Sequence, residues 1–255
     1  MSDAAHPDWL RPVFSTPGVA ALMSTRAGGC STGPFESLNL GDAVGDDPAC
    51  VERNRERFAA ALGAAPTYLR QVHGRRVVPL PVSGTPEADA CVTTAPGVAC
   101  VIQVADCLPV LLAAPDARGV AAAHAGWRGL AGGVVEATVA ALGEAAACAP
   151  AELEAWLGPC IGPRAFEVGE DVLAGFGVGP QATHPRFVAG RPGHWLADLA
   201  GLAHDRLTAL GITRVTGGRW CTVEDASRFF SFRRDRPRFG NCGRMAAAIW
   251  IERRR

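Results

Sequence analysis

Residues 98–109 form a mainly apolar segment that reads VACVIQVADCLP. Its first eight residues are rich in β-branched side chains, which favours a buried strand. Two polar residues, Asp106 and Cys107, end this otherwise apolar run. Because burial of a carboxylate costs several kcal/mol unless the group is paired, Asp106 is expected to have a strong partner.

Outward from this strand, short apolar segments alternate with segments of helical periodicity. Helices are predicted at residues 51–62 and 196–210, and another after residue 126 through residue 142. Further strands are predicted at 120–124, 151–157 and 245–251, and a strand or hairpin at 68–80 that is interrupted at His73. This mixed order predicts an α/β or α+β sandwich. We expect one domain over residues 1–255, with residues 1–13 as a short N-terminal extension.

Composition excludes several classes of function. The chain has 255 residues, of which 48% are hydrophobic and 20% charged, as in ordinary soluble globular proteins. Its formal net charge is zero, which disfavours a nucleic-acid binder. All of its basic residues are arginine, so neither a P-loop lysine nor a Schiff-base lysine is present.

Nothing in the sequence predicts secretion or membrane insertion. Residues 1–10 lack the basic start and apolar stretch of a signal peptide. The most apolar run, residues 98–112, is too short and too polar to span a bilayer. The nine cysteines are odd in number and contain no C-x-x-C pair. They are therefore interpreted as free thiols in a reducing cytosol, which predicts a cytoplasmic protein.

Two further segments carry histidines in promising positions: residues 71–74 read QVHG and residues 124–129 read HAGWRG. His124 ends a predicted strand before a turn into a helix, where backbone N–H groups point outward toward ligands. The glycine after His73 allows close approach of another backbone or a substrate. With Cys107, the two imidazoles make a good zinc set whose fourth tetrahedral position is left for water or substrate.

Each of these residues also has a structural interpretation. Taken alone, Cys107 is as easily interpreted as a small core residue as a metal ligand. Either histidine alone is as easily interpreted as a structural residue whose ring is hydrogen-bonded. A metal-free enzyme is a further alternative, with Cys107 as nucleophile and His124 as its base. A non-enzymatic binding protein would use the same pocket.

Arginines beside glycine-rich turns are candidates for holding an anion, since the guanidinium fork matches phosphate. They are Arg26, Arg128, Arg233 and Arg234. Surface ion pairs are the alternative for each of them. Cys160, in the loop GPCIGP at residues 158–163, is interpreted as a packing residue.

Together these segments resemble a known family. They are RAGG at 26–29, SLNLG at 37–41, QVHG at 71–74, ADA at 88–90, ADCLP at 105–109, HAGWRG at 124–129, GPCIGP at 158–163, FEV at 166–168 and FFSFRRD at 229–235. In this order they closely resemble the YfiH-type laccase-domain family, from about residue 14 to residue 251.

The resemblance implies an α+β fold, a single-domain layered α/β/β/α sandwich shared distantly with bacterial toxin cysteine hydrolases. It also implies that His73, Cys107 and His124 bind a metal. Zinc is the expected cofactor, with copper as a substitute. Six histidines are too few for a multicopper centre.

The activity implied is that of a zinc-dependent purine nucleoside phosphorylase. Its expected substrates are phosphate with adenosine, inosine or S-methyl-5′-thioadenosine, and adenosine deaminase activity is expected beside it. Arg26, Gln71 and Arg128 are the candidates for binding substrate or phosphate, and Asp106 or Glu167 for carrying a proton. The alternatives are a Cys107-dependent hydrolase that edits peptidoglycan precursors and a copper-dependent polyphenol oxidase. The sequence predicts no oligomeric state.

Overall fold

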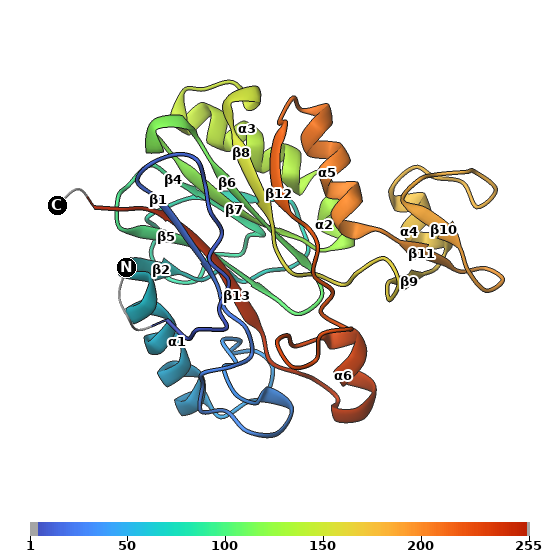
Figure 1. The fold of residues 1–255 in the computed structure, drawn as a ribbon, viewed down its shortest axis with the longest axis horizontal. Helices are drawn as coiled ribbons and strands as arrows, with labels where there is room; N and C mark the ends of the chain where they lie inside the picture. Colours follow the sequence, from blue (N-terminus) through green and yellow to red (C-terminus); the bar gives the residue numbers. More distant parts are fainter. Residues whose placement is uncertain (1–4, 254–255) are drawn as a thin grey trace.

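The computed structural model describes residues 5–253. Two β-sheets pack face to face at its centre, and helices cover both outer faces (Figure 1). A six-stranded sheet has the order β12-β8-β6-β7-β4-β3, and a four-stranded sheet has the order β1-β13-β5-β2. The α+β class and the α/β/β/α layering predicted above are therefore confirmed.

The strands of the six-stranded sheet are β3 (Val77–Pro79), β4 (Ala90–Thr93), β6 (Leu108–Ala113), β7 (Val120–Ala125), β8 (Glu154–Leu157) and β12 (Arg214–Gly217). Those of the four-stranded sheet are β1 (Val19–Met23), β2 (Ala65–Thr67), β5 (Val98–Val104) and β13 (Met245–Ile251). Because β6, β7 and β13 are buried along their whole length, β6 and β13 read as continuous apolar runs rather than as alternating ones, and β7 does so except at His124.

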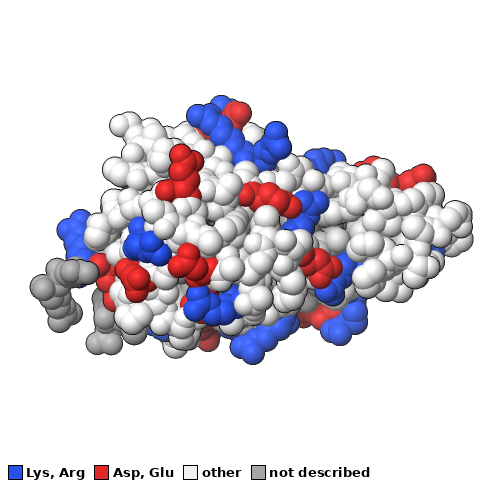
Figure 2. Space-filling view, turned by 90° about the horizontal axis from the view of Figure 1, so that it is seen from above, with Lys and Arg blue, Asp and Glu red and all other residues white. Residues whose placement is uncertain are grey.

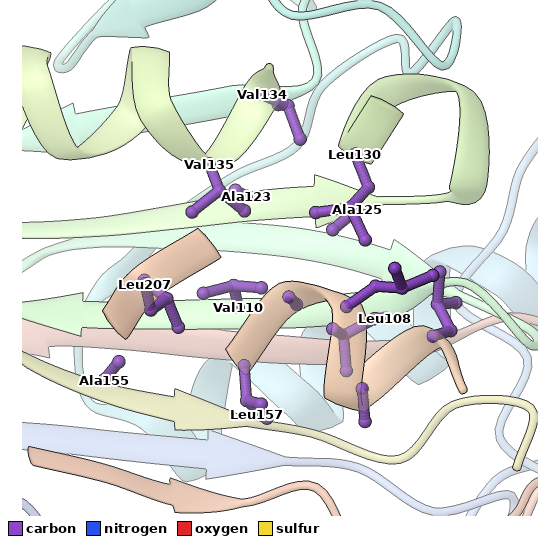
Figure 3. Close-up of a cluster of buried hydrophobic side chains, with 14 of the residues drawn as sticks. Leu108, Val110, Ala123, Ala125, Leu130, Val134, Val135, Ala155, Leu157 and Leu207 are labelled. Atoms are coloured by element: carbon purple, nitrogen blue, oxygen red, sulfur yellow. The ribbon is translucent and has the colours of Figure 1, made fainter. Parts of the chain in front are cut away.

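Three apolar clusters hold the layers together. Ile102, Leu111 and Ile249 belong to the cluster that lies between the two sheets. On the outer face of the six-stranded sheet lie α3 (Val134–Ala146) and α5 (Leu199–Ala209). Figure 3 shows side chains of both helices, among them Val135 and Leu207, pointing toward that sheet.

The opposite outer face is covered by α1 (Pro48–Leu62), which buries Phe58 and Leu62 against the four-stranded sheet. Trp9 packs on Phe58 with the ring centroids 5.6 Å apart. Part of the predicted N-terminal extension is thus packed into this layer, whereas its residues 1–4 lie outside the described residues.

The remaining elements lie at one side and one end of the sandwich. A three-stranded sheet of β9 (Glu167–Val168), β10 (Phe187–Ala189) and β11 (Trp195–Ala197) projects sideways with α4 (Glu170–Gly175) (Figure 1). The short helix α2 (Trp127–Ala131) follows β7, and α6 (Phe232–Phe239) precedes β13.

Four predicted elements differ from those in the structure. The strand expected at residues 151–157 begins at Glu154, because residues 150–152 form a short 3-10 helix. The helix expected through residue 142 is split into α2 and α3, since Gly133 takes a φ of 92° between them. The helix expected from residue 196 begins at Leu199, where Asp198 caps it by accepting from Gly201 N, and residues 195–197 form β11 instead. Of residues 68–80, only Val77–Pro79 form a strand, because His73 adopts a φ of 61°, which no strand residue has.

The surface fits the zero net charge: Figure 2 shows acidic and basic side chains interspersed on one face of the molecule. Among the described residues, no helix has both the length and the apolar character needed to cross a bilayer.

Candidate active site

The predicted site residues His73, Cys107 and His124 meet at one end of the sandwich. His124 lies on β7, next to its final residue, and Cys107 immediately precedes β6. These two strands are antiparallel neighbours in which Leu108 pairs with Ala125, so Cys107 and His124 come to the same edge of the sheet. His73 reaches this edge from the loop between β2 and β3.

The three side chains are close enough to share one ligand. Cys107 Sγ lies 3.7 Å from His73 Nε2. One donor atom from each of the three residues lies within 4.8 Å of the others. The two imidazole rings meet edge to face, with centroids 4.8 Å apart. Within residues 5–253 this is the single group of three or more His, Cys, Asp or Glu residues with such geometry.

Asp89 is the residue that organises this group. Its side chain is fully buried, and its Oδ1 lies 2.8 Å from His124 Nδ1. The same carboxylate accepts hydrogen bonds from the backbone N–H groups of Val72, His73 and Gly74, at 3.1, 2.9 and 2.7 Å. One carboxylate therefore fixes the ring of one histidine and the backbone of the other.

Glycine is required where α2 begins. A Cβ on Gly126 would lie 2.8 Å from His73 Cδ2 and 2.9 Å from Cys107 Sγ. Real Cβ atoms do not approach other heavy atoms so closely, and any side chain here would displace both residues. The glycine that follows His124 in HAGWRG thus has a steric role in the site.

The electrostatics favour a charged pair. Burial alone would raise the pKa of the Cys107 thiol, but the charge and hydrogen bond of His124, together with His73, lower it to about 6. Burial alone would lower the pKa of His124, but the Cys107 thiolate and Asp89 raise it to about 9. Burial also opposes ionisation of Asp89, yet hydrogen bonds from His124 and Gly74 hold its pKa below the usual value. Cys107 is therefore a thiolate near neutral pH, as a metal ligand or a nucleophile must be.

These residues fit a zinc ion. Zinc bonds of about 2.0–2.3 Å at tetrahedral angles place ligand atoms roughly 3.3–3.8 Å apart. The separation of Cys107 Sγ and His73 Nε2 agrees with this range, and the widest pair, at up to 4.8 Å, would close by about 1 Å. Asp89 on Nδ1 of His124 leaves Nε2 for the metal, which is the usual carboxylate–histidine support of a zinc ligand.

A cavity of about 550 Å³ opens directly onto the three residues. Its size is within the range of small-molecule sites. Its wall contains two arginines, Arg70 and Arg244, and two glutamines, Gln71 and Gln103. The other lining residues are Gly41, Asp42, Ala43, Val44, Leu69, Thr85, Val104, Ala105 and Phe232.

Of the three residues predicted to bind substrate or phosphate, Gln71 lines this cavity. Its amide is paired with the backbone of Gln103, donating to the carbonyl at 2.8 Å and accepting from the N–H at 2.8 Å. The side chain therefore ties the His73 loop to β5.

The structure places the other two predicted residues, Arg26 and Arg128, outside the cavity wall. The Arg26 guanidinium donates to the carbonyls of Glu36 and Ala226 at 2.8 and 3.0 Å and so joins two loops. Arg128 stacks on Trp127 at 4.2 Å.

Arg233 and Arg234, the arginines after the aromatic run at residues 229–232, also bind carbonyl oxygens. Arg233 donates to Glu167 O at 3.0 Å, and Arg234 to Thr222 O at 2.7 Å. Arg233 thus connects α6 to β9, and Arg234 connects it to the loop that contains Thr222.

Asp106 has the strong partners that burial demands. It accepts from the Thr222 hydroxyl and from Arg233 N, the latter at 2.6 Å. Glu167, the other candidate proton carrier, forms a two-pronged ion pair with Arg191 at 2.8 and 3.0 Å. Cys160 is buried, in agreement with its interpretation as a packing residue.

Sequence reasoning gave no role to Asp89, Arg70 or Arg244. The signal for Asp89 was present, since a carboxylate within the apolar run ADACV at residues 88–92 needs a partner as much as Asp106 does. For Arg70 and Arg244, no local pattern shows which of the arginines turn toward the cavity.

Fold and site together define a class: an α/β/β/α sandwich with a His-Cys-His centre, supported by a buried aspartate, at the wall of a small-molecule cavity. Comparison with known proteins agrees with this description. The model of the multi-copper polyphenol oxidoreductase laccase family matches residues 20–252. The chain belongs to this family, as its resemblance to the YfiH-type laccase-domain proteins predicted.

Curated relatives and solved structures match over nearly the whole chain. A purine nucleoside phosphorylase of Pseudomonas aeruginosa is 48% identical, over 96% of this chain and 98% of its own. The purine nucleoside phosphorylase YfiH of Escherichia coli is 44% identical, over 98% and 100%. Among solved structures, a Neisseria meningitidis protein (44% identical, 96% and 100% covered) has a TM-score of 0.89, and YlmD from Geobacillus stearothermophilus (33% identical, 96% and 96% covered) one of 0.87.

Proposed function

We propose that this protein is a zinc-dependent purine nucleoside phosphorylase of the cytoplasm, built as one domain. Its substrates are phosphate with adenosine, inosine or S-methyl-5′-thioadenosine, and it also deaminates adenosine. The observation that carries the proposal is the His73–Cys107–His124 group in the wall of a cavity of about 550 Å³. The names of the curated relatives support the reaction class.

In phosphorolysis, a phosphate oxygen forms a bond to C1′ of the ribose while the glycosidic bond breaks and its electron pair leaves with the purine. The protein must hold an anion beside the sugar and keep water from reacting in its place. Zinc at the three ligands would supply a fixed positive charge and a Lewis acid beside the reacting atoms. Copper in the same ligands would be a substitute rather than part of a multicopper centre.

Of the arginines in the cavity wall, Arg244 is our candidate for holding phosphate. Its Nη1 donates to the carbonyl of Cys242 at 2.8 Å, which fixes the side chain at the wall. Arg70 is more exposed than Arg244 and pairs with Glu87 at 2.7 Å. It would contact the anion from the solvent side of the cavity. This assignment replaces Arg26 and Arg128, whose guanidinium groups lie away from the cavity wall.

The test follows free purine and ribose 1-phosphate from inosine and adenosine, with and without phosphate. The proposal requires purine release that depends on phosphate. Arg244→Lys should raise the KM for phosphate at least tenfold, because lysine lacks the planar fork. Arg128→Lys is the matched control and should leave this KM unchanged. Release of purine in the absence of phosphate would instead show a hydrolase.

A second candidate function rests on the same residues without a metal. Cys107, His124 and Asp89 form a relay of thiolate, imidazolium and carboxylate, with the Asp89–His124 distance at 2.8 Å. Such a relay suits acyl transfer or amide hydrolysis, as editing of a peptidoglycan precursor requires. Metal-stripped protein that cleaves such a precursor, and no purine nucleoside, would favour this function over phosphorolysis.

A further inference from the structure

Away from the metal site, two cysteines lie against one another at the surface. Cys50 is in the first turn of α1 and Cys30 is in the loop that packs on it, and both are free and partly exposed. The Cys30 thiol lies 3.5 Å from the carbonyl oxygen of Cys50, and the Cys50 thiol 3.5 Å from the carbonyl oxygen of Cys30. These reciprocal contacts place the two thiols side by side.

One guanidinium group spans both sulfurs. Arg53 Nη2 lies 3.0 Å from Cys50 Sγ, and its Nε lies 3.5 Å from Cys30 Sγ. The two sulfurs in turn raise the pKa of Arg53. A cation in contact with a thiol stabilises the thiolate, which is the reactive form in thiol–disulfide exchange. At Cys50, burial and the neighbouring Cys30 thiol outweigh Arg53 and raise the thiol pKa above its usual value, so exchange proceeds through the minor thiolate fraction. Cys91, Cys100, Cys160 and Cys242, in contrast, are buried.

We propose that Cys30 and Cys50 form a dithiol site that closes into a reversible disulfide by exchange with a small disulfide such as oxidised glutathione. One protein thiolate attacks a sulfur of the small disulfide, whose S–S bond breaks with its electron pair on the departing thiolate. The second protein thiolate then attacks the mixed disulfide and releases the other half. Two protein thiols are oxidised, the small disulfide is reduced to two thiols, and the two cysteine protons pass to the departing thiolates.

The position of the pair relative to the cavity gives the site a structural consequence. Asn54 of α1 donates to Ser31 Oγ and to Asn39 O, both at 2.9 Å, and so holds the loop that follows Cys30. The residues directly after this loop, Gly41 to Val44, line the cavity. A Cys30–Cys50 bridge would add a covalent link at the start of the same loop. This inference does not depend on the proposed function.

The experiment treats zinc-loaded, full-length protein with oxidised glutathione and maps the products by mass spectrometry without reduction. The wild type should lose two thiols, retain no glutathione on either residue, and yield a peptide pair linked through Cys30 and Cys50. Cys30→Ser and Cys50→Ser should each keep one glutathione on the remaining cysteine, because no second thiol resolves it. Arg53→Gln should slow closure several-fold, and Arg53→Lys should restore most of the rate.

Cys148→Ser is the matched control, since Cys148 is also a partly exposed free thiol. It should close the bridge as the wild type does. Stable glutathione adducts on Cys30 or Cys50 in the wild type would overturn the proposal. So would full retention of both thiols, or a bridge between a different pair.

Discussion

The two histidines of the site lie close together but belong to different parts of the fold, one to a buried strand and one to an exposed loop. His124 lies on a central strand, is almost fully buried, and has its ring fixed by Asp89. His73 lies on an exposed loop with a φ of 61°, and Asp89 holds it through the backbone amides of residues 72–74. A buried carboxylate can thus hold a loop residue at the site through its backbone as well as a strand residue through its side chain.

The largest effect is expected when the Asp89 carboxylate, which supports both histidines, is removed. Asp89→Ala would leave three amide N–H groups and a buried imidazole unpaired. We expect a loss of about 3–5 kcal/mol in the free energy of unfolding, as for breaking a buried ion pair, and a fall in zinc affinity of at least tenfold. Urea unfolding and zinc titration would measure the two effects. Asp89→Asn keeps the shape of the side chain and one hydrogen-bond acceptor, so it should lose less of the free energy of unfolding than Asp89→Ala. If both variants lost the same amount, the charge of Asp89 would have no role.

The two histidines can be tested separately by replacing each with asparagine, a residue that tolerates positive φ. Both variants should lose most of their zinc, because each removes one of three ligands. His124→Asn should also lower the free energy of unfolding by about 2 kcal/mol, since Asp89 loses its buried partner. His73→Asn should change it by less than about 0.5 kcal/mol, as for an exposed residue. If the two variants had similar free energies of unfolding, the two histidines would be held in the fold in equivalent ways.

Gly126→Ala tests the steric requirement without removing any ligand. The added methyl group would lie within 3 Å of both His73 and Cys107 and should push them apart. We expect weaker zinc binding with the fold retained, and a destabilisation of about 1–3 kcal/mol from overpacking. Gly179→Ala, where nothing lies within 4 Å of the new Cβ, is the control. If Gly126→Ala bound zinc as tightly as the wild type, the steric requirement for glycine at position 126 would be wrong.

The smallest effect is expected on the pH dependence of Cys107 alkylation. In metal-free protein, the rate of Cys107 alkylation follows the thiolate fraction, which falls as the pH drops below the thiol pKa of about 6. The rate should therefore be nearly constant from pH 7 to pH 8 and decline below about pH 6. His124→Asn removes the main stabilising charge, so the decline should begin at a higher pH. A wild-type rate that still rises steeply between pH 7 and pH 9 would disprove the thiolate–imidazolium pair.

Local signals single out the three site residues as candidates: an apolar strand ends in Asp-Cys, His73 directly precedes a glycine, and His124 lies two residues before one. That they bind one metal together is predicted by the resemblance to the YfiH-type family, because no local spacing connects them. The role of Asp89 depends on contacts with residues 72–74 that only the fold brings together. Arg26 shows the same limit, since one of its partners, Ala226, lies 200 residues away in the chain. The break at His73 within residues 68–80 was predicted, but residues 68–72 were expected to form a strand and instead belong to the loop between β2 and β3.

Metal analysis of the purified protein shows whether His73, Cys107 and His124 form one zinc site. We expect about one zinc per chain in the wild type and almost none in Cys107→Ala, with the circular dichroism spectrum unchanged. Cys148→Ala should keep its zinc. A wild-type protein that is active with no bound metal, or that contains a coupled centre of several copper ions, would show that these residues do not form a zinc site.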